Sequence, residues 1–483
     1  MQGIWTTEQV REAEARLIRR VPEPALMRKA AFGVATEAVA MLRQHTSGVT
    51  GRRVVLLVGA GSNGGDALWA GAFLRRRGVA VTAVLLSPDR VHAPGLAALR
   101  RSGGRITSGG KDIVGTAELV IDGIVGLSAH GPLRPNAAEL VDLITAPVLA
   151  VDLPSGVEPD TGAVDGPAVR AEVTVTFGTL KPAHVLAAGA AHTGRLRLVD
   201  IGLGPELPAP DLVQLDASDV GAAWPIPGPA DDKYSQGVTG IAAGSPRFPG
   251  AAVLSAGGAV QATSGMVRFA GTAADAVRTR WPEVIATGSV TDAGRVQAWV
   301  IGPGFGVGGV SQDALRHVLG LGVPVCVDAD GITMLAEHPG LWDARDPDTP
   351  VVLTPHDGEF ARLAGPVGPD RVNAARQAAQ RFNVVLLLKG TTTVVAAPDG
   401  RALVNPARSA WPATAGSGDV LSGIIGALLA AGLDPWFAAG AAAYAHGLAA
   451  DLGANGAPVP AAGIADAIPA AVRSLRAAAA AAW

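Results

Sequence analysis

The distribution of apolar positions divides the chain into two halves of similar design. From residue 54 onward, short runs of Val, Ile and Leu end at glycine or a polar residue, as in "VVLLVGAG" (54–61), "ELVIDGIVG" (118–126) and "PVLAVDLPSG" (147–156). Helix-like segments separate these runs. Continuous apolar runs of this kind are typical of strands that are buried on both faces of a parallel sheet. We therefore expect an α/β fold whose strands end at one common edge.

A proline-rich stretch at 205–230 interrupts the pattern, which restarts in "GVTGIAAGS" (237–245) and continues through "VVLLLKGTTTVVAAP" (384–398). Residues 467–483 are rich in alanine and predict a helix. We expect an N-terminal Rossmann-like three-layer domain at 1–215, a linker at 216–230 and a second α/β domain at 231–483.

Composition narrows the class of protein. The 483 residues carry a net charge of −3, which gives no basic surface for nucleic acid or anionic membranes. The longest apolar stretch (420–433) is shorter than the roughly 20 residues that span a bilayer, and the charged N-terminus does not resemble a signal peptide. The single cysteine, Cys326, lies in an apolar run, excludes an intramolecular disulfide and is expected to be buried. We expect a cytoplasmic protein.

The first candidate site is the loop "GAGSNGGDA" (59–67), which follows a predicted strand and opens a predicted helix. It satisfies the G-x-G-x-x-G spacing that brings backbone N–H groups near a pyrophosphate. A standard dinucleotide fingerprint also needs an acidic residue at the end of the second strand, and here the only candidate, Asp89, follows a proline beyond that strand. Because Asn63 and Asp66 also add polar groups that hydride transfer does not need, a redox dehydrogenase is disfavoured.

Polar residues at predicted strand ends extend this site. Asp122, Asp152 and Ser155 follow apolar runs, and in a doubly wound sheet such ends meet at one crevice. Oxygen donors from Asn63, Asp122 and Ser155 would suit a group I or II cation. Alternatively, these side chains only cap turns.

In the second half, "AGSGDVLSG" (415–423) places Asp419 at the start of a predicted helix, after two glycines. Asp419 either caps the helix or acts as a base beside an oxyanion pocket. No Walker sequence occurs, but "KGTTTVV" (389–395) follows a predicted strand. His356 is a turn residue or a site residue, and Asp328 and Asp330 in "VDADG" either position magnesium or substrate or close a turn.

Residues 1–215 resemble the NAD(P)HX epimerase family, also called the YjeF N-terminal domain, through "GSNGGDA", "DGIVGLSAHGPLR", "AVDLPSGVEPDTG" and "TFGTLKPAH". Ser62, Ala67 and the "GLS" at 126–128 depart from the family pattern. The resemblance implies potassium ligands at Asn63, Asp122 and Ser155, a catalytic Asp152 and a candidate acid/base partner at Lys181. It implies substrate contacts at Ser62, Asn63, Gly64, Gly65, Asp66, Gly126, Leu127, Ser128, Ala129, His130, Gly131, Pro132 and Asp152.

Residues 230–475 resemble the ADP/ATP-dependent NAD(P)H-hydrate dehydratase family of the ribokinase-like superfamily, through "VIGPGFG", "VDADGI", "LTPHDGEFARL", "LLKGTTTVV" and "TAGSGDVLSG". The family's G-T-G-D appears as G-S-G-D. The resemblance implies a ribokinase-like α/β fold with Asp419 as catalytic base. It implies substrate contacts at Ala259, Gly304, Gly306, His356 and Asp419, and nucleotide contacts at Lys389, Gly390, Thr391, Thr392, Thr393 and Gly418.

Both resemblances point to one molecule, the hydrated nicotinamide cofactor NADHX or NADPHX. They imply epimerisation of its R and S forms and dehydration of the S form at the expense of ADP, with K⁺ in the first domain and Mg²⁺ with ADP (or ATP) in the second. We also expect a homo-oligomer, although the sequence carries no signal for the oligomeric state. Two alternatives stay open: the second domain as a small-molecule kinase, and the first as a binding or scaffold module.

Overall fold

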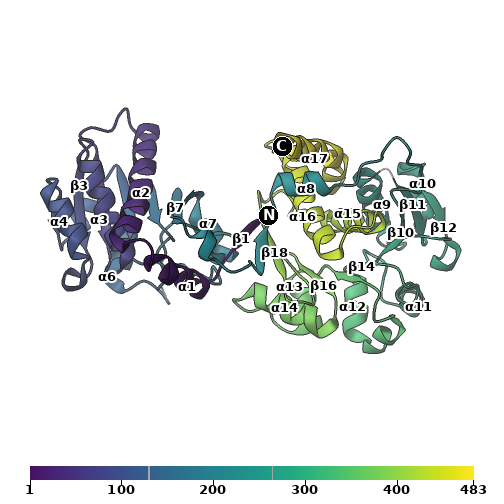
Figure 1. Cartoon of the computed structure of the whole chain (residues 1–483). Helices are drawn as coiled ribbons and strands as arrows, with labels where there is room; N and C mark the ends of the chain where they lie inside the picture. The colour runs from purple at the N-terminus through teal and green to yellow at the C-terminus, as the bar shows by residue number, and fades with distance from the viewer. Residues whose placement is uncertain (129–130, 264, 483) are drawn as a thin grey trace. The chain divides into compact units, whose positions relative to one another are not determined.

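The computed structural model describes residues 1–128, 131–263 and 265–482, and these divide into two compact units (Figure 1). The N-terminal unit is Gly3–Asp211. The C-terminal unit combines Met1–Gln2 with the chain from Leu212 onward, and β1 (Gln2–Ile4) begins in it. Both units are α/β, as the alternation of apolar runs predicts.

The structure does not contain the expected linker at 216–230 as a separate segment. Residues 212–214 form β9, which pairs in parallel with β18 of the C-terminal sheet. Helix α8 (Ala217–Ala223) follows, and a reciprocal capping box between Asp216 and Asp219 starts it. A Cβ atom on Gly221 would lie 2.0 Å from the carbonyl oxygen of Leu475, so α8 packs tightly on α17. The chain therefore enters its second unit near residue 212.

The N-terminal sheet is parallel throughout and has the order β4-β3-β2-β5-β6-β7-β8. Its central strands follow the apolar runs seen in the sequence. The strands are β2 (Arg53–Val58), β3 (Ala80–Leu85), β4 (Arg105–Thr107), β5 (Leu119–Gly123), β6 (Val148–Val151), β7 (Val173–Phe177) and β8 (Arg195–Val199).

Helices cover both faces of this sheet, which confirms the three-layer expectation. Alternate residues of β2 pack on opposite sides: Val54 and Leu56 lie in the core beneath α2 and α3, whereas Val55 and Leu57 lie in the core beneath α5 and α6. The helices are α1 (Thr7–Ile18), α2 (Glu23–His45), α3 (Ser62–Arg75), α4 (Ala93–Arg101), α5 (Lys111–Val114), α6 (Pro135–Val141) and α7 (Ala187–Thr193).

The C-terminal sheet has the order β1-β9-β18-β17-β16-β15-β14-β13-β10-β11-β12. Strand β17 is antiparallel to both of its neighbours. Strands β10 to β16 are parallel, so their carboxyl ends share one edge. The strands are β9 (Leu212–Gln214), β10 (Val238–Ala242), β11 (Met266–Ala270), β12 (Ile285–Thr287), β13 (Ala298–Ile301), β14 (Val325–Val327), β15 (Val351–Leu353), β16 (Val385–Leu388), β17 (Thr392–Ala396) and β18 (Ala402–Pro406).

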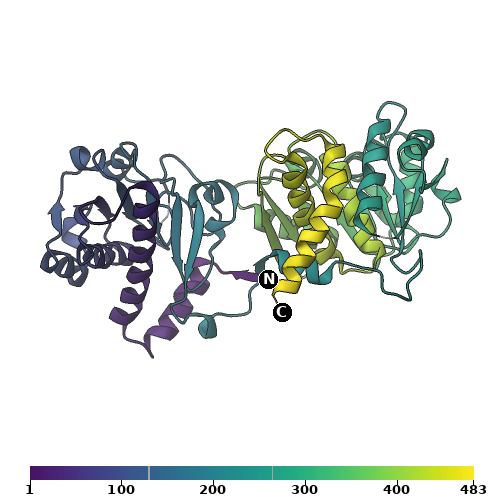
Figure 2. The ribbon, with the colours of Figure 1, turned by 90° about the horizontal axis from the view of Figure 1, so that it is seen from above.

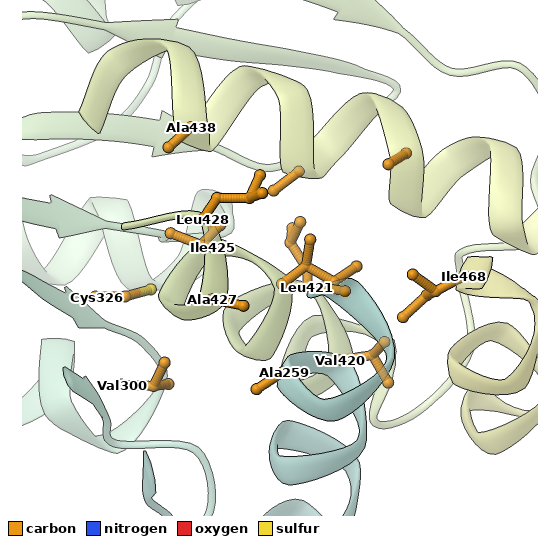
Figure 3. Close-up of a cluster of buried hydrophobic side chains, with 14 of the residues drawn as sticks. Ala259, Val300, Cys326, Val420, Leu421, Ile425, Ala427, Leu428, Ala438 and Ile468 are labelled. Carbon is orange, nitrogen blue, oxygen red and sulfur yellow. The ribbon is translucent and has the colours of Figure 1, made fainter. Parts of the chain in front are cut away.

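Helices α9, α15 and α16 lie on one face of this sheet and α11 to α14 on the other (Figure 1), and α17 packs beside α16 (Figure 2). Val300 and Cys326 of the sheet share one apolar core with Ile425 and Leu428 of α15, whereas Val420 of the same helix lies on the side of Ile468 (Figure 3). The helices are α9 (Pro249–Ala262), α10 (Ala274–Arg280), α11 (Gly309–Leu319), α12 (Asp330–Glu337), α13 (Asp357–Ala364), α14 (Arg371–Phe382), α15 (Ser417–Ala430), α16 (Pro435–Ala454) and α17 (Ala461–Ala481).

Cys326 is fully buried, as expected, and burial raises the pKa of its thiol far above the usual range. In the part of the chain that the structure describes, no helix combines the length and apolar character needed to cross a membrane.

Candidate active sites

The glycine-rich loop at 59–61 joins β2 to α3 and lies against the chain that follows β5. A Cβ atom on Gly59 would lie 1.7 Å from the carbonyl oxygen of Ile124, and one on Gly126 would lie 2.3 Å from Oδ1 of Asn63. Only glycine permits so close an approach. The N-terminus of α3, whose free N–H groups attract anions, therefore lies beside the ends of β2 and β5.

The structure brings Asn63, Asp122 and Ser155 together. The Ser155 hydroxyl donates to Oδ1 of Asp122 over 2.7 Å, and its backbone N–H donates to Oδ2 over 2.8 Å. Nδ2 of Asn63 donates to the carbonyl oxygens of Val125 (3.2 Å) and Val151 (2.6 Å). The Val125 N–H in turn donates to Oγ of Ser155 over 3.2 Å. Asn63 and Ser155 thus both contact the Val125 peptide, and Ser155 links it to the carboxylate of Asp122.

The chemistry of these residues suits a hard cation. Asp122 is fully buried, and burial raises its pKa to about 6 against the opposing hydrogen bonds from Ser155 and Ile124. No ion pair joins Asp122 to a basic side chain of the described residues. A buried carboxylate without a basic partner, flanked by neutral hydroxyl and carbonyl oxygens, offers the donor set that hard cations prefer.

Asp152 follows β6 with a φ of +66°, a conformation that few non-glycine residues adopt. Its Oδ1 accepts a 2.6 Å hydrogen bond from Nζ of the buried Lys181 and a 3.0 Å bond from Thr176. Burial would raise the pKa of Asp152, but the charge and hydrogen bond of Lys181 outweigh it, so this pKa lies below its usual range. Asp152 is therefore held ionised.

Lys181 lies behind Asp152, outside the set of residues that line the neighbouring cavity. Its Nζ also donates to Oγ1 of Thr176 (2.8 Å) and to the Phe177 carbonyl group (3.2 Å). His184, whose pKa burial lowers to about 4, accepts the Lys181 N–H at Nδ1, so its Nε2–H donates to the carbonyl oxygen of Asp152. Lys181 thus contacts Asp152 directly and does not line the cavity, and its acid/base role stays a prediction.

A cavity of about 600 Å³ opens at this edge of the sheet, and Ser62, Asn63, Asp66 and Asp152 line it. The loop after β5 contributes Gly126, Leu127, Ser128, Gly131 and Pro132, whereas the expected contacts Ala129 and His130 lie outside the described residues. Gly64 and Gly65 are buried in the first turn of α3 and do not line the cavity.

Helix α1 supplies two lining residues that the sequence analysis missed, Arg11 and Glu14. Nη2 of Arg11 donates to the carbonyl oxygen of Leu127 over 2.6 Å and so ties α1 to the loop. Burial and the charge of Asp152 raise the pKa of Glu14. The only sequence signal was their i, i+3 spacing on one face of the helix.

In the C-terminal unit, Asp419 does not cap α15. The N-cap residue is Gly416, with a φ of +83°, and no side chain caps the helix. Burial raises the pKa of Asp419 to about 7, the charges of Asp328 and Asp330 add to this rise, and Lys389 opposes it. A carboxyl group that does not cap its helix and titrates near neutrality suits a general base.

A buried polar cluster lies next to Asp419. Nζ of Lys389 donates to Oδ1 of Asp328 over 2.8 Å, and the Ser422 hydroxyl donates to Oδ2 over 2.7 Å. The buried carboxylate of Glu359 lies 4.0 Å from Nζ of Lys389. Burial would lower the pKa of Lys389, but the charges of Asp328 and Glu359 outweigh it and raise that pKa. A positive charge is thereby fixed beside the N-terminus of α15.

A second cavity of about 600 Å³ extends from this cluster over β17, β18 and α16. Of the residues expected to bind nucleotide, Lys389, Gly390, Thr391, Thr393 and Gly418 line it, whereas Thr392 is buried in β17 and does not. The lining also includes Asn405, Ser417, Tyr444 and His446, which the sequence analysis missed because they come from three different elements. Ser417 and His446 lie 3.0 Å apart, and burial lowers the pKa of His446 to about 4.

The expected substrate residues of this unit lie in different surroundings. His356 is exposed at the N-cap of α13, where its Nδ1 accepts the N–H groups of Gly358 (3.0 Å) and Glu359 (3.3 Å), so it is also a turn residue. Gly304 and Gly306 have positive φ in the loop after β13, and the Gly306 N–H donates to Asp330 over 2.8 Å.

Ala259 is a correction to the sequence analysis. It is 1% exposed in α9, and its backbone N would lie 2.9 Å from a Cβ atom built on Gly423 of α15. Figure 3 shows its side chain among the apolar residues of the core. Ala259 therefore packs two helices together, and its small size permits their close approach.

The two halves define a class of protein: a two-domain α/β enzyme with a cation-compatible crevice in one domain and a ribokinase-like nucleotide site in the other. The family model of NAD(P)H-hydrate dehydratase matches residues 239–470, and that of the YjeF-related protein N-terminus matches residues 23–183. The chain belongs to the family of bifunctional NAD(P)H-hydrate repair enzymes.

Curated relatives carry the same two-part description. The bifunctional NAD(P)H-hydrate repair enzyme Nnr of Mycobacterium tuberculosis is 56% identical over 437 residues, 90% of each chain. That of Mycobacterium leprae is 54% identical over 458 residues, 94% of each. The ADP/ATP-dependent NAD(P)H-hydrate dehydratase of Bacillus subtilis, co-crystallised with ATP/Mg²⁺, is 30% identical with a TM-score of 0.50, covering 55% of this chain and 98% of that one.

Proposed function

We propose that this protein repairs hydrated nicotinamide cofactors. Its N-terminal domain interconverts R- and S-NAD(P)HX, and its C-terminal domain dehydrates the S form with ADP, giving AMP, phosphate and NAD(P)H. The observation that carries the proposal is Asp419, which does not cap its helix and has a pKa near 7 beside a nucleotide-sized cavity. Family membership supplies the substrate class.

In the dehydration, Asp419 accepts the proton of the substrate hydroxyl while the hydroxyl oxygen attacks the terminal phosphorus of ADP. The new P–O bond forms as the bond to AMP breaks, and AMP leaves with the electron pair. The N-terminus of α15 and the charge of Lys389 stabilise the negative charge of the transferred group. Phosphate then leaves the ring carbon, with help from the ring-nitrogen lone pair, and loss of a neighbouring proton restores the dihydropyridine.

Magnesium would enter this site with the nucleotide. The residues that the structure describes include no cluster of three or more His, Cys, Asp or Glu able to hold a metal ion. This suits Mg²⁺, which is usually held by phosphates, water and one or two carboxylates. Both oxygens of Asp328 are engaged by Lys389 and Ser422, so Asp330 is the carboxylate that we assign to it. The ion would neutralise charge on the phosphates.

In the epimerase domain, we assign K⁺ to Asn63, Asp122 and Ser155 and the substrate to the adjoining cavity. The N-terminus of α3 would bind the pyrophosphate of the cofactor. Asp152, kept ionised by Lys181, is the base for the reaction at the hydroxylated carbon.

The proposal is tested by incubating the purified protein with mixed R and S epimers and following the absorbance of regenerated NAD(P)H, with and without ADP or ATP. Complete recovery that requires nucleotide is expected. Recovery of the S fraction alone would reduce the N-terminal domain to a binding or scaffold module. A stable phosphorylated product would make the second domain a small-molecule kinase.

A further inference from the structure

Three carboxyl groups from different elements face the N-terminal cavity: Glu14 of α1, Asp66 of α3 and Asp152 after β6. Asp66 is only 6% exposed, and its Oδ1 has no hydrogen-bond partner. A buried polar atom without a partner is costly, so its presence in the cavity wall indicates a group that a ligand completes.

The surroundings of these groups separate their protonation states. Lys181 and Thr176 hold Asp152 as a carboxylate. No basic group pairs with Asp66 among the described residues; burial, then the charges of Asp152 and Glu14, raise its pKa well above the usual range. Neighbouring carboxyls whose environments push their pKa values apart form an acid and a base.

Two residues in the first half of α1, Thr7 and Arg11, bind other parts of the N-terminal unit and hold the helix that carries Glu14. The N–H and hydroxyl of Thr7 donate to the two carboxylate oxygens of Asp160, each over 2.7 Å, and Arg11 donates to the Leu127 carbonyl group. Helix α1 also lies before residue 23, where the matched family region begins. Glu14 is therefore held at the cavity by contacts within its own domain.

We propose that Asp66 is the proton donor of the epimerase, that Asp152 is the proton acceptor, and that Glu14, which lines the same cavity, is a positioning residue for Asp66. This inference rests on the proposed epimerase function. Asp66 delivers its proton to the hydroxyl of the hydrated ring, and the ring-nitrogen lone pair expels water as the C–O bond breaks. Water then adds to the opposite face of the iminium ion and gives its proton to Asp152. One water leaves and one is added, so no oxidant or other reactant is needed.

The first test is Asp66→Asn, assayed by conversion of pure R-NADPHX when ADP is present. The conversion should fall by about 100-fold or more, the usual contribution of a general acid, while dehydration of pure S-NADPHX stays unchanged. Unchanged R conversion overturns the inference, whereas a wild-type protein that fails to convert R overturns the proposed function itself. Thermal unfolding of the variant shows whether the domain is intact.

The second test is the pH profile of Glu14→Gln. Asp66 feels the charges of Asp152 and Glu14. Glu14 in turn feels those of Asp152, Lys181 and Arg11, and Arg90 is a further charged residue in the cavity lining. Loss of the Glu14 charge lets Asp66 ionise more easily, so the decline of the epimerase rate at high pH should move to lower pH by about half to one unit. The matched control is Glu12→Gln, since Glu12 lies on the same helix with its side chain 63% exposed. An unshifted profile for Glu14→Gln, or an equal shift in the control, overturns the role of Glu14.

Discussion

Lys389 and Asp328 form an ion pair directly behind the turn that precedes α15, in which Asp328 is buried and Lys389 is partly exposed. Their side chains are 22% and 2% exposed, and Nζ lies 2.8 Å from Oδ1. A Cβ atom on Gly418 would lie 3.4 Å from Nζ of Lys389 and 3.8 Å from Oδ2 of Asp328. The pair thus presents a positive charge to the turn at 416–418, while burial and then the charge of Asp328 raise the pKa of Asp419.

We predict that Asp328→Asn lowers both the stability of the fold and the pKa of Asp419. Lys389 would lose its principal partner, which should lower the unfolding free energy by roughly 2–4 kcal/mol. The pKa of Asp419 should fall, so the acid limb of the dehydration rate should move to lower pH while the maximal rate drops. A pH–rate profile with pure S-NADPHX measures both effects. An unmoved acid limb would show that Asp328 does not act on Asp419.

The wild-type dehydration rate should rise with pH through about 7. Asp419 must be ionised to accept a proton, and burial raises its pKa to about 7, so the rate at pH 5.5 is expected to be a small fraction of that at pH 8. The measurement is kcat at saturating S-NADPHX and ADP. A limb near pH 4, the ordinary value of a carboxyl group, would exclude Asp419 as the titrating base.

Asp419→Asn should abolish dehydration and stabilise the protein at alkaline pH. The folded state holds the Asp419 proton up to about pH 7 and the unfolded state only to about pH 4, so this group lowers stability as pH rises from 4 to 7. Removing it should therefore raise the unfolding free energy at pH 8 by roughly 1–3 kcal/mol, with little change at pH 4. Urea unfolding at the two pH values tests the difference. Epimerisation should remain intact.

The strands were predictable because buried parallel strands must be continuously apolar, and the ends of those strands then placed Asp122, Asp152 and Ser155 at one edge. Glu14 was not predictable, because an acidic residue on an amphipathic helix looks the same whether it faces water or a cavity. Asp419 could not be assigned either, since a cap and a base share one sequence position and differ only in side-chain contacts.

Two errors have local causes. The prolines around residues 205–230 concealed the capping box of Asp216 and Asp219, so helix α8 was assigned to a linker and strand β9 to the end of the first domain. Ala259 was assigned by resemblance alone, and the sequence holds no sign that two helices cross at this position.

Potassium should stabilise the N-terminal domain in a pH-dependent way. Asp122 must be ionised to bind a cation, and its pKa is about 6, so stabilisation by KCl over tetramethylammonium chloride should be present at pH 8 and lost as pH falls through 6. Thermal unfolding of the protein in the two salts measures this. Asp122→Asn should abolish the difference, and the exposed Asp142→Asn should preserve it. Equal melting in both salts at pH 8 would exclude the cation site.

The close crossing of α9 and α15 should affect the dehydration rate, because it sets the position of the first turn of α15, which carries Asp419. A Cβ atom on Gly258 of α9 would lie 2.2 Å from the carbonyl oxygen of Val420, one residue after Asp419. Gly258→Ala must therefore push α9 and the first turn of α15 apart, at a cost of about 1–3 kcal/mol in unfolding free energy. Dehydration should fall more than tenfold because the base and the anion-binding N–H groups move together. Gly250→Ala is the matched control, because a Cβ atom there, on the same helix, meets nothing within 4 Å. If both variants dehydrate S-NADPHX at the wild-type rate, the helix crossing does not set the geometry of the site.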